Sequence, residues 1–137
     1  MQTVTLDSSL EGVDQGEALI LDAARRLGFD EDALHEIGVS VRESLVNAVA
    51  HGNRFNAKKK VHLMLSEEPD KLCIEIADEG AGFDADAVPD PLGEGNLLRQ
   101  SGRGLLMIRA FMDEVSVTRR EPSGTLVRMV KLRRPAA

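Results

Sequence analysis

Hydrophobic residues follow two different periods along this chain, and the switches between them predict its elements. Residues 2–6 alternate between apolar and polar positions, which predicts a short strand. Between Val13 and Leu27 the apolar residues recur at helical spacing, and Gly28 is typical of a helix stop. Asp30 is a suitable N-cap for a second amphipathic helix that runs to about Gly52. The first part of the chain therefore predicts one strand and two helices.

The second part of the chain returns to strand-like alternation. Apolar positions alternate from Lys60 and resume after the Pro69-Asp70 turn, which predicts a hairpin. Residues 78–101 follow neither period. A third helix and a second hairpin are expected over about 104–112, 115–119 and 125–132. Adjacent hairpins favour a mainly antiparallel sheet with helices on one face, an α+β two-layer sandwich. We interpret residues 1–137 as a single domain.

Composition narrows the possible partners. The net charge is −6, which disfavours direct nucleic-acid binding, because such binding depends on Lys and Arg displacing counterions. Trp and Tyr are absent and only four Phe are present, so an aromatic stacking platform is not expected. Basic residues gather late in the chain, where they form either a solvated strand and tail or a docking patch for an acidic protein: Arg119, Arg120, Arg128, Lys131, Arg133 and Arg134.

The cysteine count and the hydropathy pattern bear on the compartment. Cys73 is the single cysteine, so no internal disulfide can form, and its place in an apolar alternating run predicts a small buried core residue. No apolar stretch approaches the length of a membrane span, and the first residues lack the pattern of a secretory leader. We expect a cytoplasmic protein that does not bind membranes.

A row of polar residues runs along the second predicted helix. Glu43, Asn47 and His51 are spaced i, i+4, i+8. Each step turns only about 40°, so the three side chains lie on one side of the helix. Taken alone, the row is more typical of a solvated helix face.

Glycines and charged residues mark both ends of the long irregular segment. Asp78-Glu79-Gly80-Ala81-Gly82 ends an apolar strand, and a carboxylate there can accept a hydrogen bond from an amino group such as that of adenine. Ser101-Gly102-Arg103-Gly104 opens the third helix, whose free N–H groups and positive dipole end suit phosphate, and Arg99 lies just upstream. A plain Asp-Gly turn and a flexible glycine hinge are the alternatives. We expect residues 84–101 to form a lid that becomes more ordered with ligand.

The order and spacing of these segments resemble those of sequence motifs in a known protein family. Glu43-Ser-Leu-Val-Asn47-Ala-Val-Ala-His51-Gly52-Asn53 resembles the N-box of the Bergerat-fold ATPases, which include histidine kinases. Asp78-x-Gly80-x-Gly82 resembles their first glycine box, and Gly102-Arg103-Gly104 the second. The run from Gly104 to Val115 is most similar to that of the anti-sigma-factor serine kinases.

The resemblance implies a role for each of these residues. Asn47 would ligate Mg²⁺, Glu43 would be the catalytic residue that orients or deprotonates the attacking hydroxyl, and Asp78 would read the adenine amino group with help from Thr125 through water. Phosphate binding would fall to the remaining group: Gly80, Gly82, Arg99, Gly102, Arg103 and Gly104. His51 either lines the site or is a structural residue that ends the helix.

Two functions from different classes remain open at this stage. The resemblance implies an anti-sigma factor that uses ATP and Mg²⁺ to phosphorylate a serine of an anti-anti-sigma protein, that sequesters a sigma factor, and that forms a homodimer as relatives often do. The alternative is a nucleotide-gated regulatory binding module without phosphoryl transfer. A histidine-kinase catalytic domain, a chaperone and a topoisomerase are disfavoured, because the dimerisation hairpin and the transducer domains of those proteins are not present in these 137 residues.

Overall fold

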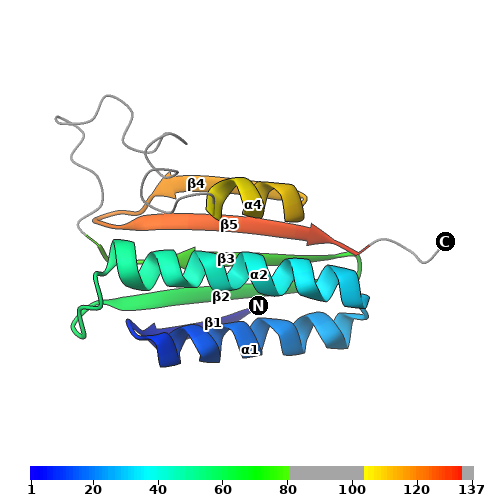
Figure 1. Cartoon of the computed structure of the whole chain (residues 1–137), viewed down its shortest axis with the longest axis horizontal. Coiled ribbons are helices and arrows are strands. Elements are labelled where there is room, and N and C mark those ends of the chain that lie inside the picture. Colours follow the sequence, from blue (N-terminus) through cyan, green and yellow to red (C-terminus); the bar gives the residue numbers. More distant parts are fainter. Residues whose placement is uncertain (81–103, 134–137) are drawn as a thin grey trace.

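The computed structural model describes residues 1–80 and 104–133. Its elements follow the expected order, with one addition, a π-helical turn labelled η1: β1 (Gln2–Asp7), α1 (Leu10–Leu27), α2 (Glu31–Val46), η1 (Asn47–Gly52), β2 (Lys60–Glu68), β3 (Lys71–Ala77), α4 (Gly104–Phe111), β4 (Glu114–Arg119) and β5 (Thr125–Leu132). The strands form one antiparallel sheet in the order β1-β2-β3-β5-β4. The helices cover one face of this sheet (Figure 1). The predicted α+β sandwich is confirmed.

Capping residues fix where the helices begin and end. The Ser9 side chain accepts a hydrogen bond from the Gly12 amide at the start of α1. Gly28 ends that helix in the left-handed region, with φ of 88°, where a residue without a Cβ is favoured. The Asp30 side chain caps α2 by accepting from the Ala33 amide at 2.8 Å, as the sequence predicts.

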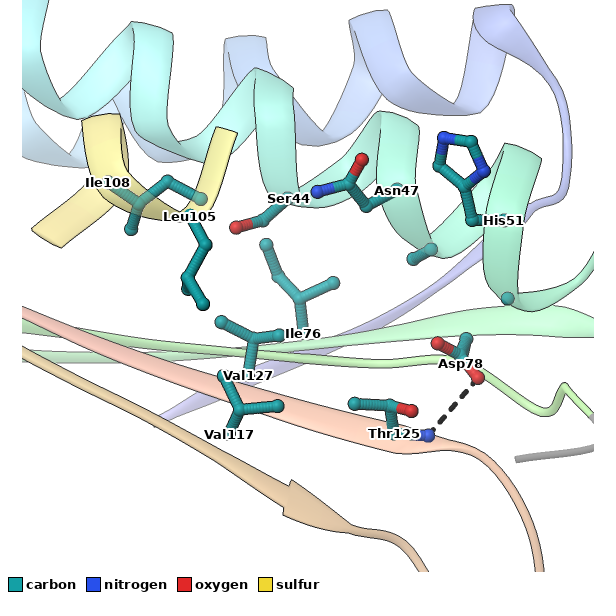
Figure 2. A pocket seen from close by; sticks show the side chains of 12 residues that line it. Ser44, Asn47, His51, Ile76, Asp78, Leu105, Ile108, Val117, Thr125 and Val127 are labelled. Carbon is teal, nitrogen blue, oxygen red and sulfur yellow. Dashed lines mark hydrogen bonds between the residues drawn. The ribbon is translucent and has the colours of Figure 1, made fainter. Parts of the chain in front are cut away.

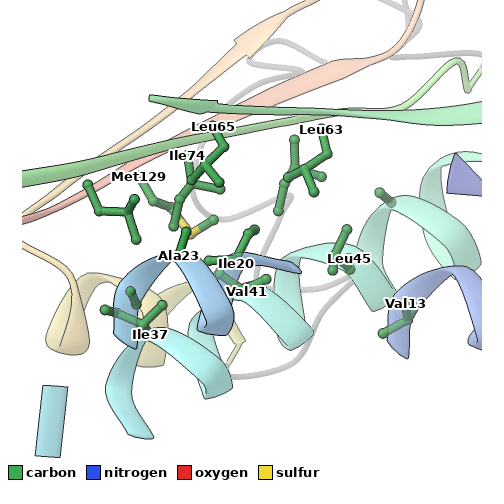
Figure 3. Close-up of a cluster of buried hydrophobic side chains, with 14 of the residues drawn as sticks. Val13, Ile20, Ala23, Ile37, Val41, Leu45, Leu63, Leu65, Ile74 and Met129 are labelled. Carbon is green, nitrogen blue, oxygen red and sulfur yellow. The ribbon is translucent and has the colours of Figure 1, made fainter. Parts of the chain in front are cut away.

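The core lies between the sheet and the helices. The strand register places Leu63 opposite Ile76, and Ile74 opposite both Leu65 and Met129, so that one face of the sheet is continuously apolar. The apolar stripes of α1 and α2 pack onto this face (Figure 3), and the side chains that meet there are fully buried: Ile20, Ala23, Ile37, Val41 and Leu45. Burial of this kind is the main contribution to the stability of the fold.

The end of the second helix differs from the sequence-based expectation. We predicted one α-helix to Gly52, but the last six residues, Asn47–Gly52, form a π-helical turn. The wider turn is closed by the Asn53 amide, which donates to the carbonyl of Ala48 at 2.8 Å. It brings Gly52 so close to the Asp78 carboxylate that a Cβ there would overlap it. Inserted π-turns of this kind occur often at functional sites.

The expectation for Cys73 is wrong. Leu72 and Ile74 are fully buried, whereas Cys73 is only half-buried, because alternation along a strand sends neighbouring side chains to opposite faces. Cys73 therefore lies on the sheet face that the helices leave uncovered. Among the helices of residues 1–80 and 104–133, none is long and apolar enough to cross a membrane.

Candidate functional site

A pocket opens between the sheet and the end of the second helix. Figure 2 shows side chains from α2 and η1 on one side, from β3, β4 and β5 on the floor, and from α4 beside them. The space measures about 620 Å³, including the part open to solvent. Its lining combines apolar side chains with a few polar groups: Ser44, Asn47, Ala48, His51, Gly52, Ile76, Asp78, Leu105, Ile108, Val117, Thr125 and Val127. Ligand pockets commonly have such a mostly apolar lining with a few polar groups.

Asp78 is the buried polar group at one end of this pocket. It directly follows β3 and is 7% exposed. Its Oδ1 accepts hydrogen bonds from the Gly80 amide at 2.9 Å and from the Thr125 amide at 3.1 Å. Among the described residues no group donates to Oδ2. One carboxylate oxygen is therefore fixed by the backbone, and the other is left to accept a hydrogen bond from a ligand.

Burial raises the pKa of the Asp78 carboxyl above its usual value. The two backbone donors, Gly80 and Thr125, and the more distant charges of Arg120 and Lys59 act in the opposite direction. The direction of the shift shows that desolvation of the charged form is the larger effect. A ligand amino group that donates to Oδ2 would compensate part of this desolvation.

Thr125 and Gly80 support Asp78 from two sides. Thr125 begins β5, lines the pocket, and also accepts a backbone hydrogen bond from the Asp78 amide at 3.0 Å. Gly80 is buried and contributes its amide to the carboxylate. The structure thus brings together three residues that the sequence analysis selected at this end of the pocket.

Asn47, Glu43 and Gly104 lie toward the other end. Asn47 is half-buried and lines the pocket, and Glu43 is half-buried one turn earlier on α2. Gly104 begins α4 directly against Glu43, so closely that a Cβ on this glycine would overlap the Glu43 carboxylate. The helix N-terminus that was expected to bind phosphate therefore faces the residue that was expected to be catalytic.

The structure adds residues that sequence reasoning missed. His51 is exposed, lines the pocket and also lies in the last turn of η1, so both readings of this residue stay open. Ser44, which lies beside Asn47 in Figure 2, was missed because a serine on a helix carries no motif of its own. The apolar floor was also missed: Ile76, Leu105, Ile108, Val117 and Val127. Alternation along the strands identifies some of these as apolar but does not separate pocket floor from core.

Several expected site residues lie outside the described residues. These are Gly82, Arg99, Gly102 and Arg103, together with the proposed lid over 84–101. Their roles in phosphate binding stay predictions.

Two of the late basic residues, Arg128 and Lys131, form ion pairs within the fold. Arg128 lies 3.8 Å from carboxylate oxygens of both Glu75 and Glu114. Lys131 bonds to Glu36 at 3.2 Å and to the carbonyl of Phe111 at 2.5 Å. Both side chains thus have acidic or carbonyl partners within the described part of the fold.

Comparison with known proteins identifies the family of this chain. The model of the histidine kinase-like ATPase domain matches residues 7–131, which include every site residue named above. The chain belongs to this family. The expected resemblance is thereby confirmed.

Relatives within the family come from bacterial regulators. The chain is 31% identical over 133 residues to the serine-protein kinase RsbW of Staphylococcus epidermidis, covering 92% of this chain and 82% of that protein. It is 34% identical over 102 residues to the anti-sigma F factor of Bacillus subtilis, covering 73% of this chain and 70% of that protein. The expected relation to anti-sigma-factor kinases is confirmed by these names.

A solved structure agrees with the fold. The RsbU and RsbW domains of Rv1364c from Mycobacterium tuberculosis superpose with a TM-score of 0.69 at 18% identity, over 98% of this chain and 32% of that one. At this level of identity the likeness concerns the fold alone.

Proposed function

We propose that this ATPase-family protein is an ATP-dependent protein serine kinase and anti-sigma factor. It transfers the γ-phosphoryl group of ATP to a serine of an anti-anti-sigma protein and sequesters a sigma factor. The observation that carries this proposal is the arrangement of the pocket: a buried Asp78 at one end, and Asn47 and Glu43 on successive turns of one helix at the other. The names of the relatives support the same activity.

The base is recognised at the Asp78 end. Oδ2 accepts a hydrogen bond from the amino group of adenine, while Oδ1 stays bonded to the Gly80 and Thr125 amides. The flat base lies over the apolar floor formed by Ile76 and Val127. Guanine presents a carbonyl oxygen where adenine has its amino group, and this oxygen would face a carboxylate. ATP is therefore favoured over GTP.

The residues toward α4 fit a nucleotide that arrives with Mg²⁺. Asn47 offers an amide oxygen, and hard cations such as Mg²⁺ take oxygen ligands and use few of them from protein when phosphates supply the others. No other side chain among the described residues hydrogen-bonds to Asn47, so its oxygen is available. Mg²⁺ would supply charge neutralisation of the phosphates, which phosphoryl transfer requires.

Glu43 acts on the attacking serine. The serine oxygen forms a bond to the γ-phosphorus, the bond from that phosphorus to the β,γ-bridging oxygen breaks, and ADP leaves with the electron pair. The serine proton passes to the Glu43 carboxylate. Its position one turn before Asn47 allows the carboxylate to reach a nucleophile beside the γ-phosphate while Asn47 serves the metal.

A cytoplasmic location and a homodimer belong to the same proposal. An anti-sigma factor meets its sigma factor where transcription takes place, and this requires a cytoplasmic location. Light scattering of the purified chain would give twice the mass of the 14.9 kDa monomer.

The decisive experiment is phosphoryl transfer in a defined mixture. The purified chain is incubated with Mg²⁺, γ-labelled ATP and a candidate anti-anti-sigma protein from the same organism. A second mixture contains the same candidate with its acceptor serine changed to alanine. We expect label on the first candidate only. If nucleotide binds and no candidate is labelled, the nucleotide-gated binding module becomes the better account.

A further inference from the structure

Asn53 lies behind the adenine-reading end of the pocket and is 2% exposed. It directly follows η1, and it does not line the pocket itself. All its side-chain hydrogen bonds reach other segments. Nδ2 donates to the Ser8 hydroxyl and to the Lys60 carbonyl, each at 2.9 Å, and Oδ1 accepts from the Glu79 amide at 2.8 Å. One buried side chain thus joins the ends of β1 and β3 to the start of β2.

The bond to the Glu79 amide matters because of its place in the chain. Glu79 stands between Asp78, the proposed base-reading carboxylate, and Gly80, whose amide holds Oδ1 of that carboxylate at 2.9 Å. An oxygen fixed on the amide of residue 79 limits rotation of the peptide that joins Asp78 to Glu79. It therefore limits where Oδ2 of Asp78 can point.

The Glu79 side chain strengthens the same anchor. Oε1 accepts from the Lys60 amide at 3.0 Å, and Oε2 lies 2.5 Å from Nε2 of His62. These bonds hold the side chain against the start of β2, outside the pocket lining. Backbone and side chain of residue 79 are thus fixed separately, the backbone by Asn53 and the side chain by β2.

We propose that Asn53 is a positioning residue for base selectivity: through its Oδ1 bond to the Glu79 amide it aims Asp78 Oδ2 at the base. The inference rests on the proposed contact between Asp78 and adenine. It assigns the preference for ATP to a pair of residues rather than to Asp78 alone. A purely structural role for Asn53 would lower stability without changing the relative affinities for the two bases.

Three variants of the full chain separate these roles. Asn53→Ala removes all three bonds. Asn53→Asp retains an oxygen for the Glu79 amide and loses the two Nδ2 donations. Ser8→Ala removes one of those donations and the bond from Ser8 to the Lys59 carbonyl, and leaves the Glu79 amide untouched. The last two variants therefore lower stability while retaining the proposed positioning bond.

The first measurement is the ratio of ATP to GTP affinity by titration calorimetry with Mg²⁺, with urea unfolding of each variant alongside. We expect Asn53→Ala to lower the ratio about tenfold, because a fixed acceptor becomes a loosely placed one. Asn53→Asp and Ser8→Ala should stay within about twofold of the wild-type ratio even where they unfold more easily. A wild-type ratio in Asn53→Ala, or an equal fall in Ser8→Ala, would overturn the proposal.

A second measurement needs no nucleotide. Hydrogen exchange of the Glu79 amide should be slow in the wild type, Asn53→Asp and Ser8→Ala, and fast in Asn53→Ala. Slow exchange in Asn53→Ala would overturn the positioning role even if ATP binds normally. Conversely, a wild type that shows slow exchange and no preference for ATP would contradict the proposed reading of adenine by Asp78 while leaving the Asn53 anchor in place.

Discussion

The two ends of the pocket are built differently. At the base end the Asp78 carboxylate is nearly buried, has one oxygen occupied by two backbone amides, and is backed by Asn53. At the other end Glu43 and Asn47 are half-buried, and within the described residues their side chains make no hydrogen bonds. Under the proposed function, a fixed acceptor at Asp78 suits recognition of a base, and unbonded side chains at Glu43 and Asn47 suit binding of a nucleophile and a metal. The difference predicts that nucleotide selectivity and phosphoryl transfer can be altered separately.

The largest effect is expected for a change at Glu43, and it concerns the rate of phosphoryl transfer. Glu43→Ala should lower phosphoryl transfer by about 10²–10⁴-fold, because the proton acceptor is lost. ATP affinity should be nearly unchanged, since Glu43 is not among the residues that line the pocket. Single-turnover transfer of labelled phosphate to the partner serine, with calorimetry of ATP binding, measures both quantities.

Asn47→Ala is the matched control for that experiment. It should weaken Mg²⁺-ATP binding and transfer together, because the proposed metal ligand contributes to both. Transfer by Glu43→Ala at the wild-type rate would show that the base assignment is wrong.

The next effect tests the contact between α4 and α2. In Gly104→Ala the new Cβ overlaps the Glu43 carboxylate, which can move because it is the end of a flexible side chain. We expect a folded protein in which transfer falls by up to about 10²-fold, since small misplacements of a catalytic group are costly. In a Glu43→Ala background the same change should have little further effect on the rate. Additive losses in the double variant would place Gly104 in a separate role.

Asp78→Asn tests the other end of the pocket through nucleotide affinity and selectivity. Loss of a charged acceptor should lower ATP affinity by about 10- to 100-fold and reduce the preference for ATP over GTP. Calorimetry with both nucleotides measures the change. An unchanged preference would mean that Asp78 does not read the base.

The same variant has an opposite expected effect on folding. Burial raises the pKa of Asp78, so its contribution to stability is greatest below the unfolded-state pKa and is lost as the pH rises through the folded-state pKa. At neutral pH Asp78→Asn should therefore be more stable than the wild type, and the difference should disappear in acid. Urea unfolding across this range tests the sign, and a less stable variant at pH 7 would contradict it.

The smallest effect is expected far from both ends of the pocket. Arg26 forms exposed ion pairs with Asp22 and Glu67 at the opposite end of the sheet from Asp78. Arg26→Ala should change the free energy of unfolding by less than about 1 kcal/mol, because exposed pairs are screened by water. Nucleotide affinity and transfer should both equal those of the wild type. A clear loss of affinity would show that the two ends of the sheet are coupled.

The sequence by itself determined the fold class and indicated the residues of the candidate site. Period-two and helical spacing placed the strands and α-helices of the described residues to within a few residues, because burying one face of each element requires those periods. Asp78, Gly80, Asn47 and Glu43 were selected by residue type, spacing and family resemblance. The structure places Asp78 and Asn47 in the lining of one pocket, with Gly80 bonded to Asp78 and Glu43 one turn before Asn47. Patterns of this kind involve residues close together in the sequence, so they can be recognised without the tertiary structure.

Only the tertiary structure decided what depends on approach between distant segments. The π-turn at Asn47–Gly52 places Gly52 against the Asp78 carboxylate, and the helical spacing of the sequence did not predict this turn. Cys73 was predicted to be buried because its neighbours in the sequence are apolar. In the sheet, neighbouring residues of a strand point to opposite faces, and Cys73 is on the face without helices. Asn53 bonds to Ser8, 45 residues before it, and to Glu79, 26 residues after it. No sequence motif links residues at such separations. Hydrogen bonds between remote segments are fixed by packing, so the anchor behind Asp78 became visible only once the sheet was assembled.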